Sequence, residues 1–320
     1  MFKIRSLIIS DFEKLKEIFK EKHYFEKINS SIVNKIASLL QPLTPSSFRF
    51  LPSIHLAVEG KNILGFIVLT CLSKTNNCWQ IDEVFVFDEV RNSGFGEELL
   101  RYVLSVYGSQ GVEHFLAEID PGNSPALSLF HACGFRRCAK VGFYEKEVSI
   151  EKLSESNSLE NNFILRPQTK NDLTELEKID LSSVPPDLRG ALGRSKEYFK
   201  DKKNSYVLID KSRNSIVGFF QILYNQNDNY YIELLLNPGW THLYEQFINT
   251  IILDYLTIKQ NKLTLSIKAI DYLTDLTEVL TKLGYLRSEV KEILLRTIWQ
   301  KIKEKKKKTA ASPVPWAAPT

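Results

Sequence analysis

The stretch Arg91-Asn92-Ser93-Gly94-Phe95-Gly96 joins two segments with different hydrophobic patterns. Before it, Val84-Phe85-Val86-Phe87 is a short apolar run, which predicts a buried strand. After it, residues 97–104 have the leucine spacing of a helix, with two glutamates in the first turn. The sequence therefore predicts a strand, a glycine loop and a helix, in that order.

Such a loop can bind an anion. Backbone N–H groups and the positive end of the helix converge on one point, where a phosphate group fits. Gly94 and Gly96 let a ligand approach the main chain closely, because no Cβ is present. An ordinary strand-to-helix turn has the same short pattern, so this motif alone leaves both interpretations open.

A second motif follows at residues 123–135, with the pattern N-x-x-A-x-x-L-F-x-x-x-G-F. Asn123 or Ser124 can cap a helix whose first turn contains Pro125. Gly134 is suited to end this helix, and Phe135 opens another strand. The two motifs, in this order, resemble the GNAT superfamily of acyl-CoA-dependent N-acyltransferases.

The resemblance is specific over residues 80–145 and extends over residues 2–148. It implies an α/β fold of the mixed α+β kind, in which helices flank a mixed, partly parallel central sheet. Acyl-CoA would lie in a V-shaped gap between parallel strands near 79–88 and 113–119, and a closing strand pair would follow the helix at 124–132.

Cofactor-binding positions also follow from the resemblance. Amides near Phe85 and Val86 would bind the pantetheine and the acyl carbonyl, and the loop amides would bind the pyrophosphate. Asn123 would contact the pantetheine arm, a role that helix capping does not exclude. The implied set is Phe85, Val86, Arg91, Asn92, Ser93, Gly94, Phe95, Gly96, Asn123 and Phe130.

The chemistry of such a site is attack of an amine on a thioester. A lysine-like amine has a pKa of about 10.4, so its deprotonation near pH 7 costs roughly 4–5 kcal/mol, and a general base helps most there. Glu118 is the first candidate, and Glu83 or Asp82 on the other strand comes second. Glu118 could equally be a solvated strand residue.

The usual general acid of the family is missing. Family members often have a tyrosine at the position of Phe130, where it protonates the leaving thiolate. Another tyrosine such as Tyr144, a water molecule or an absence of catalysis are the remaining options. Because the thiol has a pKa of about 8.5, this loss is tolerable. Tyr144 could also be an ordinary strand aromatic.

The chain contains an internal repeat. Ile4-Arg5 matches Leu165-Arg166, and an aspartate follows six residues after each arginine. We therefore predict two GNAT-like domains at residues 1–150 and 163–300. Residues 301–320 form a basic tail that we expect to be disordered.

The second copy has lost the chemistry of the first. Tyr244 and Gln246 replace the two loop glycines, and Leu273 replaces Asn123. We expect this degenerate half to lack a cofactor site, to pack against the first half and to close one wall of the acceptor cleft.

Composition narrows the remaining choices. The 320 residues are 43% hydrophobic and 25% charged, as in ordinary globular proteins, and no apolar run has the length of a membrane span. Residues 301–308 hold six lysines and one glutamate, so the rest of the chain has a net charge of −1, which makes nucleic acid an unlikely partner. Four cysteines without a C-x-x-C pair predict a cytoplasmic protein with reduced thiols and no metal.

The leading hypothesis is an N-acetyltransferase that transfers acetyl from acetyl-CoA to a primary amine. A non-catalytic acyl-CoA sensor is the main alternative, and a structural interaction module is a weaker one. The acceptor, the acyl length and the oligomeric state stay open at this point.

Overall fold

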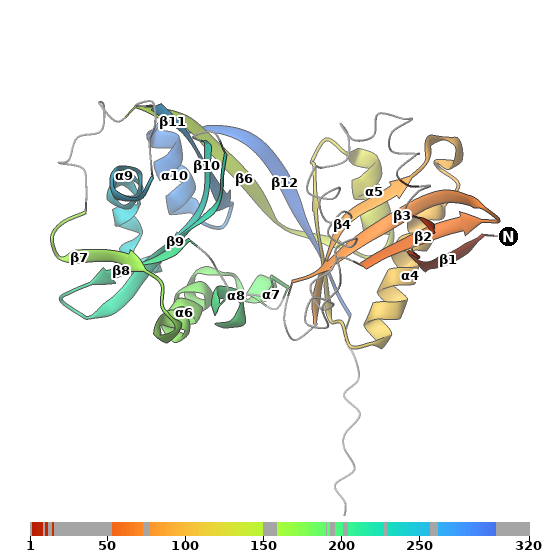
Figure 1. The fold of residues 1–320 in the computed structure, drawn as a ribbon, viewed down its shortest axis with the longest axis horizontal. Helices are drawn as coiled ribbons and strands as arrows, with labels where there is room; N and C mark the ends of the chain where they lie inside the picture. Colours follow the sequence, from red (N-terminus) through yellow and green to blue (C-terminus); the bar gives the residue numbers. More distant parts are fainter. Residues whose placement is uncertain are drawn as a thin grey trace, which may run out of the picture.

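A computed structural model of the chain shows two lobes joined by two long strands (Figure 1). It describes residues 2–8, 10–11, 15, 53–72, 77–149, 159–189, 191–192, 196–200, 204–226, 229–256 and 262–298. The predicted basic tail at 301–320 lies outside these residues, as do residues 150–158 between the two halves.

The first half contains the predicted strand, loop and helix order. Its elements are β1 (Lys3–Ser6), β2 (Ser53–Glu59), β3 (Asn62–Cys71), β4 (Cys78–Val86), the 3₁₀ helix η1 (Asp88–Val90), α4 (Phe95–Ser109), β5 (His114–Ile119), α5 (Ser124–Ala132) and β6 (Arg136–Ser149). The apolar run at the end of β4 is half-buried rather than buried, except for Phe87 just after it.

The second half repeats this order. Its elements are β7 (Phe163–Pro167), η4 (Lys170–Asp172), α6 (Leu173–Ser183), α7 (Pro186–Arg189), α8 (Lys196–Lys200), β8 (Ser205–Asp210), β9 (Ser215–Gln226), β10 (Asn229–Leu236), η5 (Pro238–Leu243), α9 (Tyr244–Tyr255), β11 (Lys262–Ile270), α10 (Thr274–Lys282) and β12 (Leu286–Thr297).

The described strands form one continuous sheet of twelve, in the order β1-β2-β3-β4-β5-β12-β6-β11-β10-β9-β8-β7. The pairs β4–β5 and β10–β11 are parallel, and the other neighbours are antiparallel. This arrangement confirms the predicted mixed, partly parallel sheet with flanking helices.

The two halves exchange strands at the centre of the sheet. β12 of the second half lies between β5 and β6, and β6 of the first half lies between β12 and β11. The predicted closing strand pair is therefore wrong, because residues 136–149 continue as one 14-residue strand. Gly142, the one glycine in this segment, stays inside the strand instead of turning the chain.

The exchanged strands also cap helices in the opposite half. The Arg296 guanidinium of β12 donates to the carbonyl of Cys133, the C-cap of α5. In the same way, Lys146 Nζ of β6 donates to the carbonyl of Leu283, the C-cap of α10, at 2.5 Å. Cations suit these carbonyls because the C-terminal end of a helix carries partial negative charge. The exchange is thus reciprocal.

The predicted repeat is present in the three-dimensional contacts. Arg5 donates two hydrogen bonds to the Asp11 carboxylate, at 2.5 and 2.8 Å. Arg166 makes the same bidentate pair with Asp172, at 2.7 Å for both bonds. The backbone amide three residues before each aspartate also donates to it. One local design therefore recurs in both halves.

Each lobe has a core that includes side chains from the other half. Leu294 of β12 packs in the core of the first lobe, and Tyr144 and Val148 of β6 pack in the core of the second. All four cysteines lie in the described residues, and none of them forms a disulfide there. Over the described ranges, the helices are too short or too polar for any of them to cross a membrane.

Candidate active site

The central gap of the first lobe opens between β4 and β5. Their parallel ladder runs from Cys78 paired with His114 to Ile81 paired with Ala117. Beyond that point β5 pairs with β12 on its other side, through Glu118 and Ile119. The last residues of β4 pair only with β3 in the described sheet. The parallel ladder of β4 and β5 therefore ends where the resemblance places the V-shaped gap.

The backbone direction at the end of β4 decides which amides face this gap. Phe87 N donates to Leu64 O, so its amide points toward the β3 side. Amides alternate along a strand, so the Phe85 amide points the same way and the Val86 amide points into the gap. Of the two predicted positions, Phe85 and Val86, only Val86 has an N–H group that points away from β3.

The loop after β4 has the backbone of an anion-binding turn. Asn92 and Gly94 are both left-handed, with φ of 62° and 83°, and Gly94 is the N-cap of α4. The first N–H groups of a helix have no partner inside it, and they point out of its N-terminal end. A Cβ added to Gly94 would meet no atom within 4 Å, so open space surrounds this point.

Gly96 places the loop against the other elements of the site. A Cβ on Gly96 would lie 3.5 Å from Val86 Cγ2 and 3.4 Å from Leu129 Cδ2 of α5. The loop, the end of β4 and α5 are therefore adjacent. Arg91 is exposed and forms an ion pair with Asp88 at 2.8 Å.

α5 contributes its N-terminus to the same region. Asn123 caps this helix, because its Oδ1 accepts from Ala126 N at 3.1 Å. The side-chain NH₂ of Asn123 is a second polar group at this exposed position. Phe130 instead belongs to the core: it is 3% exposed and packs edge-to-face on Phe135. The Phe130 ring therefore lies in the core, apart from the other predicted cofactor-binding residues.

Glu83 is the titratable group that its surroundings perturb most clearly beside the gap. A bulge in β4 separates it from Ile81, since Val68 pairs with Glu83 and Leu69 with Ile81. Burial, with the adjacent Asp82 carboxylate as a smaller cause, raises the pKa of Glu83 to about 7. Asp82 itself accepts a hydrogen bond from Thr70 Oγ1 at 2.5 Å.

Glu118 sits on the opposite strand of the gap and is tied to the second half. Its Oε1 lies 3.9 Å from Lys268 Nζ of β11, and both side chains are about a quarter exposed. The carboxylate is half-buried rather than fully solvated.

Tyr144 does not join these residues. It is 8% exposed within the core of the second lobe, and the Arg287 guanidinium lies 5.9 Å from its ring centroid. This environment is that of a strand aromatic in the exchanged strand β6. No sequence signal could show that β6 crosses to the other lobe.

The second half has closed the equivalent of this site. Tyr244 is 1% exposed, and its hydroxyl accepts the Leu236 N–H at 3.3 Å. Leu236 is the counterpart of Val86, whose amide points into the gap of the first lobe. Leu273, the counterpart of Asn123, makes no side-chain cap for α10. The Tyr244 side chain thus accepts the hydrogen bond from the Leu236 N–H group, which a cofactor would need as a donor.

Metal ligands are not gathered in the part of the chain that the structure describes. Within those residues, no three His, Cys, Asp or Glu side chains lie close enough together to hold a metal ion.

Residues 12–135 match the acetyltransferase (GNAT) family, so the first half of the chain contains a domain of that family. No curated protein sequence matches the chain at a significant level.

Solved structures resemble both halves of the chain together. A GCN5-related N-acetyltransferase from Sphaerobacter thermophilus is 12% identical with a TM-score of 0.55, over 92% of this chain and 95% of that one. A tandem GNAT protein from the clavulanic acid biosynthesis pathway is 11% identical with a TM-score of 0.52, over 93% and 98%. A GCN5-related N-acetyltransferase from Anabaena variabilis is 14% identical with a TM-score of 0.54, over 93% and 73%. At these identities the likeness establishes the fold.

Proposed function

We propose that this chain, whose residues 12–135 match the GNAT family, is an acyl-CoA-dependent N-acyltransferase that moves acetyl from acetyl-CoA to a primary amine. The observation that carries the proposal is the conjunction of three features at one gap. These are the Val86 amide directed into the gap, the open glycine loop at Gly94, and the carboxyl of Glu83 with its pKa near neutrality.

The residues of the gap fit the cosubstrate. The loop from Arg91 to Gly96 would hold the pyrophosphate, with Ser93 and Phe95 as loop positions, because its backbone N–H groups converge where no side chain intrudes. Val86 N and the Asn123 side chain would hold the pantetheine arm. When bound, acetyl-CoA supplies an activated acyl group as a thioester.

Glu83 would remove the proton from the attacking amine. The new N–C bond forms as the C–S bond breaks, the proton passes from nitrogen to the Glu83 carboxylate, and the thiolate takes a proton from water. A base with a pKa near the working pH combines availability with basicity. No protein acid is required at Phe130, because the leaving thiolate is a good leaving group.

A non-catalytic acyl-CoA sensor remains the alternative, favoured by Phe130 in place of a tyrosine and by the closed second half. The two functions separate in one assay: a panel of primary amines is offered with acetyl-CoA, and free thiol is measured. Release of thiol that depends on the amine supports the transferase, and binding without release supports the sensor.

The domain limits and the cellular location belong to the same proposal. We place the cosubstrate domain at residues 1–150 and the degenerate domain at 163–300, followed by the basic tail at 301–320. The reduced state of the four cysteines is consistent with the cytoplasm.

One acetyl-CoA should bind per chain. The first lobe keeps its loop glycines, whereas Tyr244 already uses the equivalent backbone amide in the second lobe. Isothermal titration calorimetry should therefore give a stoichiometry near one. A stoichiometry of two would contradict the closure of the second lobe.

Gly96→Tyr should abolish acetyl-CoA binding without unfolding the protein. The backbone of Gly96 is not left-handed, and a Cβ there would lie against Val86 Cγ2 and Leu129 Cδ2, so a tyrosine ring has to enter the space between the loop, the end of β4 and α5 and displace the loop from its binding geometry. Gly94 is a poorer position for this test, because its φ of 83° makes any side chain there strained.

Gly239→Ala is the matched control for this loop. It lies in the equivalent loop of the second lobe, where a Cβ would meet only Asn237 Oδ1, at 3.8 Å. Calorimetry should show unchanged affinity for Gly239→Ala and no measurable binding for Gly96→Tyr, with equal circular dichroism for both. Full affinity in Gly96→Tyr would remove the loop from the site.

A further inference from the structure

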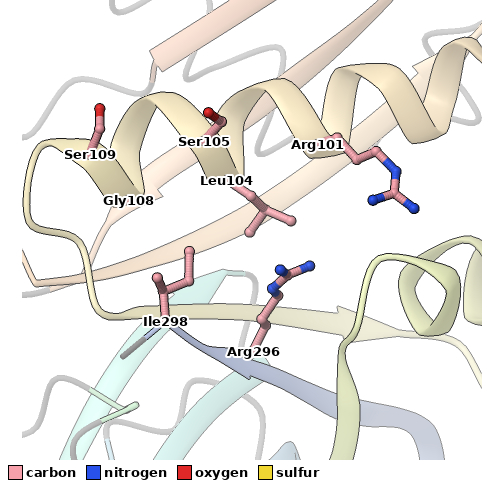
Figure 2. A pocket seen from close by; sticks show the side chains of 7 residues that line it. All are labelled: Arg101, Leu104, Ser105, Gly108, Ser109, Arg296 and Ile298. Atoms are coloured by element: carbon pink, nitrogen blue, oxygen red, sulfur yellow. The ribbon is translucent and has the colours of Figure 1, made fainter. Parts of the chain in front are cut away.

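Arg296 and Lys268 are cationic side chains of the second half that contact residues of the first lobe. Arg296 lines a hollow of about 330 Å³ between α4 and the end of β12, together with Arg101 (Figure 2). Its guanidinium donates to the Cys133 carbonyl, so helix capping accounts for its position. Lys268 differs, because its primary amine lies 3.9 Å from Glu118 Oε1 of β5, a strand that borders the proposed acetyl-CoA gap.

Lys268 and Glu118 occupy equivalent positions of the internal repeat. Each lies five residues before the N-cap of the next helix, which is Leu273 in the second half and Asn123 in the first. The first half therefore has a carboxylate where the second half has a primary amine. The second copy thus brings an amine to a candidate base of the first.

The two side chains lie on the same face of the sheet. Side chains alternate along a strand, so Glu118 points to the side of Leu116, and Lys268 points to the side of Ile270. Leu116 and Ile270 pack in one apolar cluster. Ala117 packs instead in the core that α4 covers. The amine and the carboxylate therefore both face away from α4.

Glu83, the proposed base, shares this face. Val84 packs in the same core as Ala117, so Glu83 before it points to the opposite side of β4. The parallel ladder of β4 and β5 ends just before Glu118. The Lys268 amine therefore lies on the face of the sheet that carries both candidate bases, beside the point where the ladder ends.

On its other side, Lys268 lines a narrow cavity of the second lobe. This cavity lies between α6, β10 and β11, and its lining includes Asp180 and Glu233. Its volume of about 10 Å³ is room for about one water molecule, so an amine substrate does not fit there. This side of the ion pair is thus closed to an acceptor from solution, and Lys268 is the amine held there.

We propose that Lys268 is an internal acceptor, acetylated at Nζ by the first lobe of the same chain. The inference rests on the proposed function, because acetyl-CoA supplies the acyl group. Lysine has a flexible four-carbon stem, so the amine can move from Glu118 toward the thioester.

The reaction is ordinary amide formation. The Lys268 ammonium gives one proton to the Glu118 carboxylate, and its nitrogen attacks the carbonyl carbon of the thioester. The N–C bond forms as the C–S bond breaks. The nitrogen then loses a second proton to water, and the thiolate takes a proton from water. The products are acetyl-lysine and free CoA.

The test measures acetyl-lysine by peptide mass spectrometry after the full chain is incubated with acetyl-CoA and no added amine. Lys262 is the matched reference, because it lies on the same strand and also pairs with a carboxylate, that of Glu147, at 2.7 Å. The Lys262 side chain is 65% exposed and that of Lys268 is 29% exposed, so uncatalysed acetylation should favour Lys262. We expect the reverse order, with an initial rate at Lys268 at least about tenfold higher, because the site holds both reactants together.

Variants separate the catalysed reaction from chemical acetylation. Lys268→Arg keeps the charge but has no amine to acylate, so it should lose most acetyl incorporation, whereas Lys262→Arg should retain it. Gly96→Tyr, which we expect not to bind acetyl-CoA, should lose the acetylation of Lys268 and keep the slow reaction at Lys262. The rate per chain should not change with protein concentration, because both groups belong to one molecule.

Three results would overturn the inference: a rate at Lys268 no higher than at Lys262, an equal rate at Lys268 in Gly96→Tyr, or a rate per chain that rises with protein concentration. Amine-dependent release of thiol without acetylation of Lys268 would overturn this inference alone and leave the proposed function in place. Failure of the chain to bind acetyl-CoA would overturn both.

Discussion

Leu294→Asp should unfold the first lobe, although Leu294 belongs to the second half of the chain. Its side chain is fully buried in a core otherwise made of first-half residues such as Leu99 and Phe115. The substitution removes a buried aliphatic side chain, worth about 2–5 kcal/mol, and it also puts a carboxylate in an apolar core. A domain is stable by only about 5–15 kcal/mol, so the combined loss is severe.

Leu286→Asp is a control on the same strand. Leu286 is 76% exposed, so its replacement should change stability by no more than about 0.5 kcal/mol. Thermal unfolding by circular dichroism and acetyl-CoA binding should both distinguish the two variants. If Leu294→Asp melts like the wild type and keeps its affinity, β12 is not an integral part of the first lobe.

The strand exchange also changes what a cut between the halves should do. Length alone favours an autonomous first half, because about 150 residues can bury a core of their own. In the structure, however, β5 pairs with β12 over residues 114–119. A fragment of residues 1–150 would expose that strand edge, and exposed edges promote aggregation. We expect each fragment to be insoluble alone and the co-expressed fragments to co-purify.

Local signals in the sequence predicted the backbone elements around the proposed cosubstrate site. The glycine loop, the Asn123 cap and the Gly134 stop each act within a few residues, so a pattern can express them. The Arg5 and Arg166 motifs likewise put their aspartates six residues away, and the structure confirms the repeat. In each of these motifs the interacting residues are only a few positions apart, so a short sequence pattern includes all of them.

The remaining features depend on contacts between distant segments. The pattern of β12 predicts a buried strand, but nothing in it specifies β5 as the partner. The ion pair of Glu118 with Lys268 spans 150 residues, and the hollow at Arg101 needs Arg296 from the other half. The choice between Glu83 and Glu118 as the base also depends on how deeply each carboxylate is buried and on whether it forms an ion pair, and a single sequence shows neither.

Glu83→Gln should lower activity and raise stability at alkaline pH. If Glu83 is the general base, its loss should reduce kcat/KM near pH 7 by about 10²–10⁴-fold. Part of the activity should return as the pH rises toward the pKa of the amine, because the acceptor then loses its proton without help. The pH–rate profile of the variant should therefore be steeper above pH 7 than that of the wild type.

The stability change follows from the direction of the pKa shift. Folding raises the Glu83 pKa from 4.5 to about 7, so between these pH values the folded protein binds more protons than the unfolded chain. The free energy of unfolding therefore falls as the pH rises from 4.5 through 7, by up to about 3 kcal/mol. Glutamine does not titrate, so the variant escapes this loss and should melt at a higher temperature than the wild type at pH 8.

Glu118→Gln separates the two carboxylates. Glu118 forms an ion pair with Lys268, and the substitution breaks that pair, so it should give no stability gain at pH 8 and a smaller loss of kcat/KM than Glu83→Gln. If Glu83→Gln gains stability at pH 8 and also loses kcat/KM, then the buried position of Glu83 costs stability and serves catalysis. An unchanged pH–rate profile in both variants would exclude general-base catalysis by either residue, and a larger effect of Glu118→Gln would make that carboxylate the base.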